Sequence, residues 1–86
     1  MSKDRPDRGV EDIDWSVPVP RANRIRVCDF TSDMQPVFYE LCMAAGLMFI
    51  RRFCRRETGM VVHESPWMRT EEARNLWARL LNGECR

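Results

Sequence analysis

Two apolar runs separated by a short connection constrain the fold of this chain most strongly. The first run, 47–54, holds Leu, Met, Phe, Ile, Phe and Cys, and the second, 60–62, contains two consecutive valines. β-Branched and aromatic residues pack well on a pleated surface, so both runs favour strands. Gly59 closes the connection and can adopt the positive φ that a tight turn needs. We therefore predict a β-hairpin over residues 47–65, ended by Pro66, which cannot donate to a ladder.

The segment after the hairpin has the periodicity of an amphipathic helix. Its apolar residues recur at spacings of three, four, seven and eight, and they are Ala73, Leu76, Trp77, Leu80 and Leu81. Thr70 suits an N-cap, because its hydroxyl can accept a free amide hydrogen of the first turn. Gly83 suits the left-handed residue just past a helix end. We predict a helix over 70–82 that covers the hairpin, with Trp77 as its main buried residue.

The preceding segment reads as a strand followed by a helix. Residues 24–30 alternate weakly, which indicates a short strand. If Asp33 caps a helix, Pro36 falls in its first turn, where its missing N–H does no harm. An apolar stripe then follows, made of Val37, Phe38, Leu41, Cys42 and Ala45. The predicted fold is a small two-layer α+β domain of order β-α-β-β-α, with a three-stranded sheet and two helices packed on one face.

The N-terminal quarter of the chain is mixed in charge and poor in apolar residues. We expect a flexible arm over 1–22 and a single α+β domain over 23–86, because such a segment buries little surface against its ordering entropy. Within the arm, Ile13, Trp15, Val17 and Val19 alternate with polar residues and prolines. Two interpretations remain open: the arm lays Trp15 back onto its own domain, or Trp15 belongs to a linear motif for a partner.

Composition limits the classes of partner. The 86 residues carry a net charge of only +1, so no global field attracts nucleic acid or an anionic membrane. Arginine outnumbers lysine thirteen to one, which is typical of coding from a GC-rich genome, and we expect a bacterial source. No apolar run reaches the length of about 20 residues that a membrane span needs, and no signal peptide is evident. We expect a cytoplasmic protein that does not bind membranes.

Four cysteines, Cys28, Cys42, Cys54 and Cys85, are irregularly spaced and form no C-x-x-C pair. Short paired spacings are typical of structural zinc sites, so we predict no metal and no cofactor. In a reducing cytoplasm they are expected to be free thiols, with Cys28, Cys42 and Cys54 acting as small buried hydrophobic residues.

The arginine run in the hairpin is the main binding candidate. In a strand, Arg51 and Arg55 share one face while Arg52 and Arg56 share the other, and Arg69 lies near the hairpin base. Outward guanidinium groups beside phenylalanines can contact phosphates and bases. The alternative is a solvated strand edge, where charge prevents aggregation. The near-zero net charge favours this alternative.

His63 is the single histidine and the weak catalytic candidate of the chain. From the helix predicted after Asp33 onward, the order of elements resembles the HicA-type small ribonuclease toxins, in which a helix leads to strands and a closing helix, with a histidine on a strand. That resemblance implies a ribonuclease using His63, although this histidine follows Val61 and Val62 rather than the family's Gly-Ser.

The sequence therefore predicts a non-enzymatic interaction or regulatory module. It would bind a protein partner, or a second copy of itself, through the sheet face or edge and the Trp15 arm. The alternatives are nucleic-acid binding through Arg51, Arg52, Arg55, Arg56 and Arg69, and the ribonuclease that the HicA resemblance implies.

Overall fold

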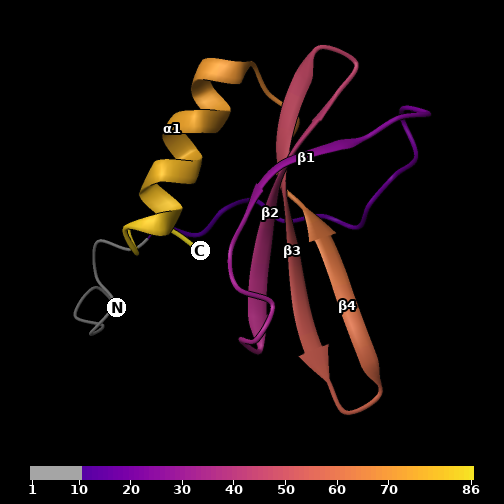
Figure 1. Cartoon of the computed structure of the whole chain (residues 1–86), viewed down its shortest axis with the longest axis vertical. Helices are drawn as coiled ribbons and strands as arrows, with labels where there is room; N and C mark the ends of the chain where they lie inside the picture. Colours follow the sequence, from indigo (N-terminus) through magenta and orange to yellow (C-terminus); the bar gives the residue numbers. More distant parts are fainter. Residues whose placement is uncertain (1–10) are drawn as a thin grey trace, which may run out of the picture.

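The computed structural model describes residues 11–86, which form a four-stranded antiparallel sheet and one helix (Figure 1). The strands are β1 (Arg26–Phe30), β2 (Val37–Ala44), β3 (Leu47–Arg56) and β4 (Gly59–Glu64), and each lies beside its neighbour in the sequence. The helix α1 (Thr70–Leu81) follows the last strand. The small α+β domain is confirmed, as are the hairpin around residues 47–65 and the C-terminal helix.

The first predicted helix is wrong, because the segment after Pro36 is the strand β2. Its apolar residues fit a helical stripe, but every residue of this segment except Glu40 is apolar, so a strand buried on both faces fits as well, and Val37, Phe38 and Tyr39 are strand formers. Pairing with β3 along all eight residues decides between the two patterns. The sheet consequently has four strands rather than three, the domain has one helix among residues 11–86, and the order is β-β-β-β-α.

A two-residue turn, Ala45 and Gly46, joins β2 to β3. Both residues have positive φ, 53° and 78°, as a type I′ turn requires. The turn sets the register in which Ala44 faces Leu47 and Leu41 faces Ile50. The second hairpin turns through Glu57 and Thr58, and Gly59 has a φ of 135°, which confirms the predicted role of this glycine.

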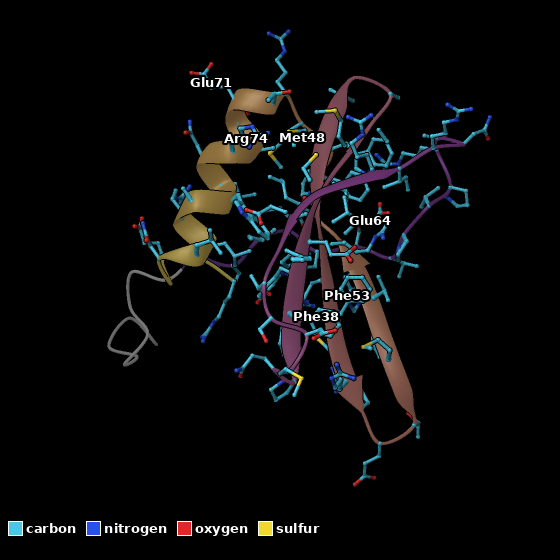
Figure 2. The ribbon with its side chains drawn as sticks, viewed as in Figure 1. Phe38, Met48, Phe53, Glu64, Glu71 and Arg74 are labelled. Atoms are coloured by element: carbon cyan, nitrogen blue, oxygen red, sulfur yellow. The ribbon has the colours of Figure 1, made fainter. Side chains whose placement is uncertain are left out.

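The two faces of the sheet are covered differently. We call the face of the sheet that packs against α1 the helix face, and the other the opposite face. Leu41 on β2 and Met48 and Ile50 on β3 lie on the helix face and are fully buried. Figure 2 shows Met48 between β3 and the helix, with Glu71 pointing away from the sheet. Trp77 is 5% exposed, as predicted for the main buried residue of the helix. Leu81, predicted in the apolar stripe, is instead 55% exposed.

The helix boundaries follow from its caps. Arg69 is the N-cap and makes no side-chain capping bond, so the prediction of Thr70 as N-cap is wrong. At the other end, Gly83 has a φ of 78° and its amide donates to the carbonyl of Leu80, while the Glu84 amide donates to Arg79. This is the Schellman arrangement, and it confirms the glycine stop predicted at Gly83.

The segment before β1 wraps around the sheet. Ile13 is buried in the core of the helix face, and its amide donates to the carbonyl of Arg86, so the first described residues lie beside the C-terminal tail. Farther along, Ala22 and Trp67 pack over Phe49 on the opposite face, where the Trp67 and Phe49 rings stack at 4.4 Å. The division into an arm over 1–22 and a domain over 23–86 stays a prediction, and residues 1–10 lie outside the described part.

Candidate functional site

The outer edge of β4 presents backbone groups that the fold leaves unused. Glu64 pairs with Ser16 of the wrapping segment: each amide donates to the other's carbonyl, at 2.8 and 2.9 Å. The next amide, that of Ser65, points the other way and donates to Ile50 on β3. Because backbone direction alternates along a strand, Val62 and Met60 also point outward. Among residues 11–86 no backbone partner meets them there.

Proline explains why the pairing ends after one residue. Continuing antiparallel from Ser16 opposite Glu64 would place Pro18 opposite Val62 and Pro20 opposite Met60. Proline has no N–H to donate, so both positions are unsuited to the ladder. The segment instead passes onto the opposite face, where these two prolines line a hollow of about 370 Å³ that also borders Val62.

Over residues 59–62, the β4 edge lacks charge and a bulge, two of the devices that usually prevent edge pairing. Residues 59–62 carry no charge, and Met60 is 45% exposed. The other sheet edge, β1, has a bulge between Val27 and Asp29 and carries charged residues on either side of it. Bulges and charges are common protections of edge strands. Of the two edges of the described sheet, β4 is therefore the better suited to accept another strand.

The arginine run does not form one basic patch. Arg51 and Arg55 lie on the opposite face, as the predicted alternation requires, and Arg52 lies on the helix face. Arg56 at the end of β3 and Arg69 before the helix are both exposed to solvent. The structure therefore distributes these five binding candidates over different surfaces.

Two of the arginines make contacts within the domain on the opposite face. Arg51 pairs with Glu40 at 3.2 Å and lies over the Phe49 ring. Arg55 lies over Phe38 at 5.2 Å and donates to the carbonyl of Asp33. Figure 2 labels Phe38 and Phe53, whose rings stack in this region at 4.8 Å. These guanidinium groups hold aromatic rings and loops of their own chain.

Arg52 connects the predicted sites Trp15 and His63 on the helix face. Its guanidinium carbon lies 4.6 Å from the centre of the Trp15 ring, and one terminal nitrogen lies 3.4 Å from Nδ1 of His63. Trp15 is half-buried and stacks on Tyr39 at 6.0 Å. Burial raises the pKa of Tyr39, although the positive charge of Arg52 opposes that shift. Trp15 thus lies back on its own domain, which is the first of the two interpretations offered for it.

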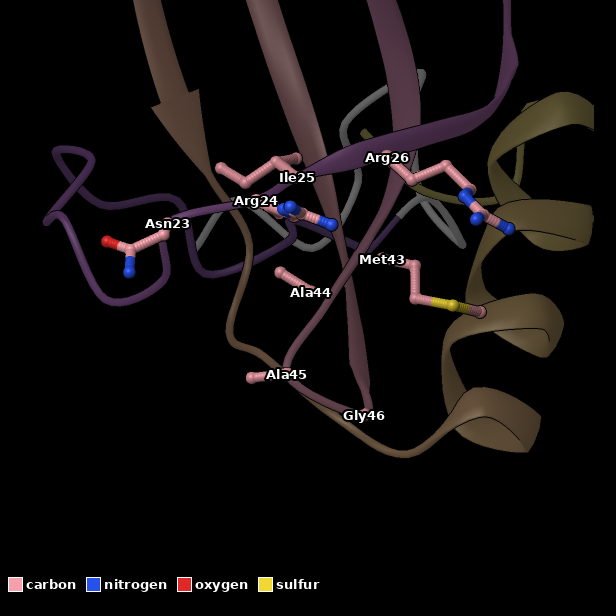
Figure 3. A pocket seen from close by; sticks show the side chains of 8 residues that line it. All are labelled: Asn23, Arg24, Ile25, Arg26, Met43, Ala44, Ala45 and Gly46. Carbon is pink, nitrogen blue, oxygen red and sulfur yellow. The ribbon is translucent and has the colours of Figure 1, made fainter.

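A hollow of about 680 Å³ lies between the segment leading into β1 and the β2–β3 turn. Figure 3 shows Met43 and Arg26 on the side toward the helix, with Asn23 on the far side. Arg24 and Arg26 are its charged residues, and no histidine, cysteine or carboxylate lines it. This hollow therefore offers no set of groups for acid–base or nucleophilic chemistry.

The cysteines are free thiols that differ in burial. Cys42 and Cys85 are buried and Cys54 is half-buried, whereas Cys28 is exposed, so the prediction of a buried Cys28 is wrong. Cys28 occupies the bulge of β1, an irregularity that the sequence did not indicate. Burial raises the pKa of Cys42 to about 11 and also raises that of Cys85. Within residues 11–86, no three His, Cys, Asp or Glu side chains gather as a metal site would require.

Comparisons with protein family models, with curated proteins and with solved structures find no match to this chain. The element order that carried the HicA resemblance is also absent, since a strand stands where its first helix was predicted. None of the described helical segments is both long and apolar enough to cross a membrane.

Sequence reasoning missed the β4 edge as a specific site. The signal was present in two places: an uncharged stretch over 59–62, and prolines at every second position, Pro18 and Pro20, in the segment that reaches this edge. These two patterns indicate an open edge only in combination with the pairing of Ser16 and Glu64, which the sequence does not show.

Proposed function

We propose that this protein is a non-enzymatic interaction module that binds a protein segment by strand addition along the outer edge of β4. The observation that carries the proposal is the pair of outward-facing residues, Met60 and Val62, whose backbone groups meet no partner among residues 11–86. An extended segment laid beside them would gain main-chain hydrogen bonds and cover the exposed Met60 side chain. The wrapping segment before β1, which contains Trp15, contributes through Ser16. Because Ser16 pairs with Glu64, it limits where an added strand can lie.

The contacts of the arginines support this proposal over nucleic-acid binding. Three guanidinium groups, those of Arg51, Arg52 and Arg55, lie over aromatic rings of the domain. A phosphate-binding surface instead gathers basic groups on one side of the molecule. Nucleic-acid binding would require affinity that falls steeply with salt, since each neutralised phosphate releases counterions. Titration of mixed single-stranded and duplex probes at two salt concentrations measures this directly, and we expect no salt-dependent binding.

Catalysis by His63 has little support from its surroundings. Its Nδ1 faces the guanidinium of Arg52, which can donate a hydrogen bond but cannot act as a base. A histidine base usually works beside a nucleophile and a group that orients it. A ribonuclease assay of the parent chain and of His63→Ala tests this alternative, and we expect neither to cleave RNA.

Site-specific photo-cross-linking tests the proposed edge. A benzophenone amino acid replaces Met60 at the edge or, as a matched control, Leu81, which is similarly exposed but lies on the helix. The full chain is irradiated in an extract of its source cells. We expect a protein adduct from position 60 only, and its loss when Val62→Pro is added, because proline removes the outward N–H of Val62. Equal adducts from both positions, or none from position 60, would contradict the proposal.

A further inference from the structure

We propose that the strand added to this edge is β4 of a second copy, paired antiparallel about a two-fold axis at Val61. The inference rests on the proposed function, since it names the occupant of the same edge. Met60 of each copy would lie opposite Val62 of the other, and the two Val61 residues would face each other. The result is a continuous sheet across two copies of the chain, with one self-complementary interface.

The register follows from which backbone groups are unused. Met60 and Val62 point outward, whereas Glu64 already pairs with Ser16. In an antiparallel ladder, two opposed outward residues exchange both of their bonds. Pairing Met60 with Val62 of the second copy, twice by symmetry, uses all the free groups and forms about four hydrogen bonds. An axis at Val62 would instead place Met60 opposite Glu64, whose groups are occupied, and an axis at Met60 would place Val62 opposite the turn residue Thr58.

The ends of the added strand also fit the space available. In the proposed register, Thr58 of the second copy would come opposite Glu64, where Ser16 is already bound. Thr58 belongs to the turn between β3 and β4, and this turn bends toward its own β3. The second copy therefore leaves the ladder at the position where Ser16 closes it. A longer partner strand would meet Ser16 and could not extend the pairing at that end.

The side chains along this register are compatible with one another. On the opposite face Met60 would lie against Val62, and on the helix face Val61 would lie against Val61, so apolar groups meet in both layers. His63 would stand opposite Gly59. Because Gly59 has no side chain, no charged group would face the imidazole. Charged residues opposite like charges disfavour pairing, and this register has none among residues 59–63.

The interface is small, so the association is expected to be weak and reversible. Only two outward residues per copy take part, which places the contact among transient interfaces that bury less than about 1,200 Å². Sedimentation equilibrium of the purified full chain between about 10 µM and 1 mM covers the corresponding range of affinity. We expect the mean mass to rise from one chain toward two over this range.

A disulfide trap tests the register. The two Val61 residues would form a non-hydrogen-bonded pair with Cα atoms about 4.5 Å apart, within the range of a disulfide. Val61→Cys is made in a background of Cys28→Ser, which removes an exposed thiol, and Cys54→Ser, because Cys54 on β3 lies opposite Val61 in the ladder. We expect Val61→Cys to form covalent dimers at least about tenfold faster than Met60→Cys, whose two copies would stand more than 7 Å apart diagonally.

Proline variants test the hydrogen bonds. Val62→Pro removes an N–H that the single chain does not use, and proline is tolerated on the outer side of an edge strand. We expect it to fold, as shown by an unchanged far-ultraviolet circular dichroism spectrum, and to weaken self-association at least about tenfold. Val62→Thr keeps both the N–H and the β-branch, and should associate like the parent. If Val62→Pro fails to fold, Met60→Pro serves the same purpose, because its N–H also points outward.

The results separate this inference from the proposed function. A chain that stays monomeric throughout the concentration range, or equal trapping rates for Val61→Cys and Met60→Cys, overturns self-pairing. If the photo-adduct at position 60 then contains a different protein, strand addition stands and only the identity of the partner was wrong. If no adduct forms at position 60 either, both proposals fail.

Discussion

The indole N–H of Trp77 on α1 donates to a carboxylate oxygen of Asp29 on β1 at 3.0 Å. This bond joins the helix to the first strand through two residues that are 48 positions apart in the chain. The Trp77 ring is otherwise buried among apolar residues of the helix face. One side chain therefore supplies both the packing of the core and a polar link to the β1 edge.

Removing Trp77 should destabilise the domain severely. Trp77→Ala is expected to lower the free energy of unfolding by about 3–5 kcal/mol, because it leaves a cavity in the core that the neighbouring side chains cannot fill. A domain of this length has roughly 4–13 kcal/mol in total, so the variant should be largely unfolded or melt far below the parent. Leu81→Ala is the matched control: Leu81 lies on the same helix but is exposed, and we expect a change within about 0.5 kcal/mol. Equal melting of the two variants would contradict the packing described.

The hydrogen bond itself can be separated from the packing. Asp29→Ala leaves the indole N–H without its acceptor and should cost about 1–3 kcal/mol. Asp29→Asn keeps a carbonyl oxygen in place and should cost clearly less. Urea unfolding followed by tryptophan fluorescence measures both. If Asn and Ala at this position are equally destabilising, the N–H to oxygen contact contributes nothing.

The β2–β3 turn should be improvable at Ala45. This alanine has a φ of 53°, a left-handed conformation that costs an ordinary L-residue roughly 1–2 kcal/mol. Ala45→Asn creates Asn-Gly, the sequence that type I′ turns prefer, and should stabilise the domain by about 0.5–1 kcal/mol. Gly46→Ala is the converse control and should destabilise it, since Gly46 has a φ of 78°. The midpoints of thermal unfolding should move in opposite directions, and movement in the same direction would exclude this turn geometry.

Trp15 should stabilise the domain even though it precedes the sheet. Its ring stacks on Tyr39 and lies beneath Arg52, contacts that together contribute about 1–3 kcal/mol. Trp15→Ala is expected to lower stability by that amount, and Arg52→Gln by about 1 kcal/mol through loss of the cation–π contact together with the contact to His63. Val17→Ala, at an exposed position nearby, serves as the control. A Trp15→Ala chain as stable as the parent would show that this residue is free for another role.

Alkaline pH should destabilise the fold through buried thiols. The pKa of Cys42 rises from 9.0 to about 11 through burial, so between these values the unfolded thiol ionises while the folded thiol keeps its proton. The folded state then binds more protons, and stability falls as pH rises through this window, by up to about 3 kcal/mol. Cys42→Ala should be less stable near neutral pH but should lose stability less steeply above pH 9. Parallel curves for the two proteins would contradict the assignment.

The elements that were predicted correctly are those that local sequence patterns determine. The β3–β4 hairpin, its glycine at 59, the α1 stripe around Trp77 and the stop at Gly83 each depend on a residue type with one strong conformational preference. The prediction of a helix for the segment 37–44 was wrong because its apolar residues fit both a helical stripe and a strand buried on both faces. Pairing with β3 resolves that ambiguity, and pairing over long sequence separations is not visible in a local pattern.

The candidate site was only partly predictable for the same reason. The alternation of Arg51 and Arg52 between faces follows from strand geometry and was predicted. The rings they lie over, Phe49 and Trp15, come from β3 itself and from a segment far earlier in the chain. The unused groups of Met60 and Val62 depend on where Ser16 ends its pairing, which only the assembled fold shows.

Amide hydrogen exchange along β4 tests the central claim most directly. In dilute protein, the amides of Met60 and Val62 should exchange rapidly, whereas those of Val61 and His63, which point toward β3, should be protected. As the concentration rises toward about 1 mM, we expect protection to appear at Met60 and Val62 as the edge becomes paired. Fast exchange at these two amides at every concentration and with source-cell extract present, or protection already complete in dilute solution, would contradict an edge open for pairing.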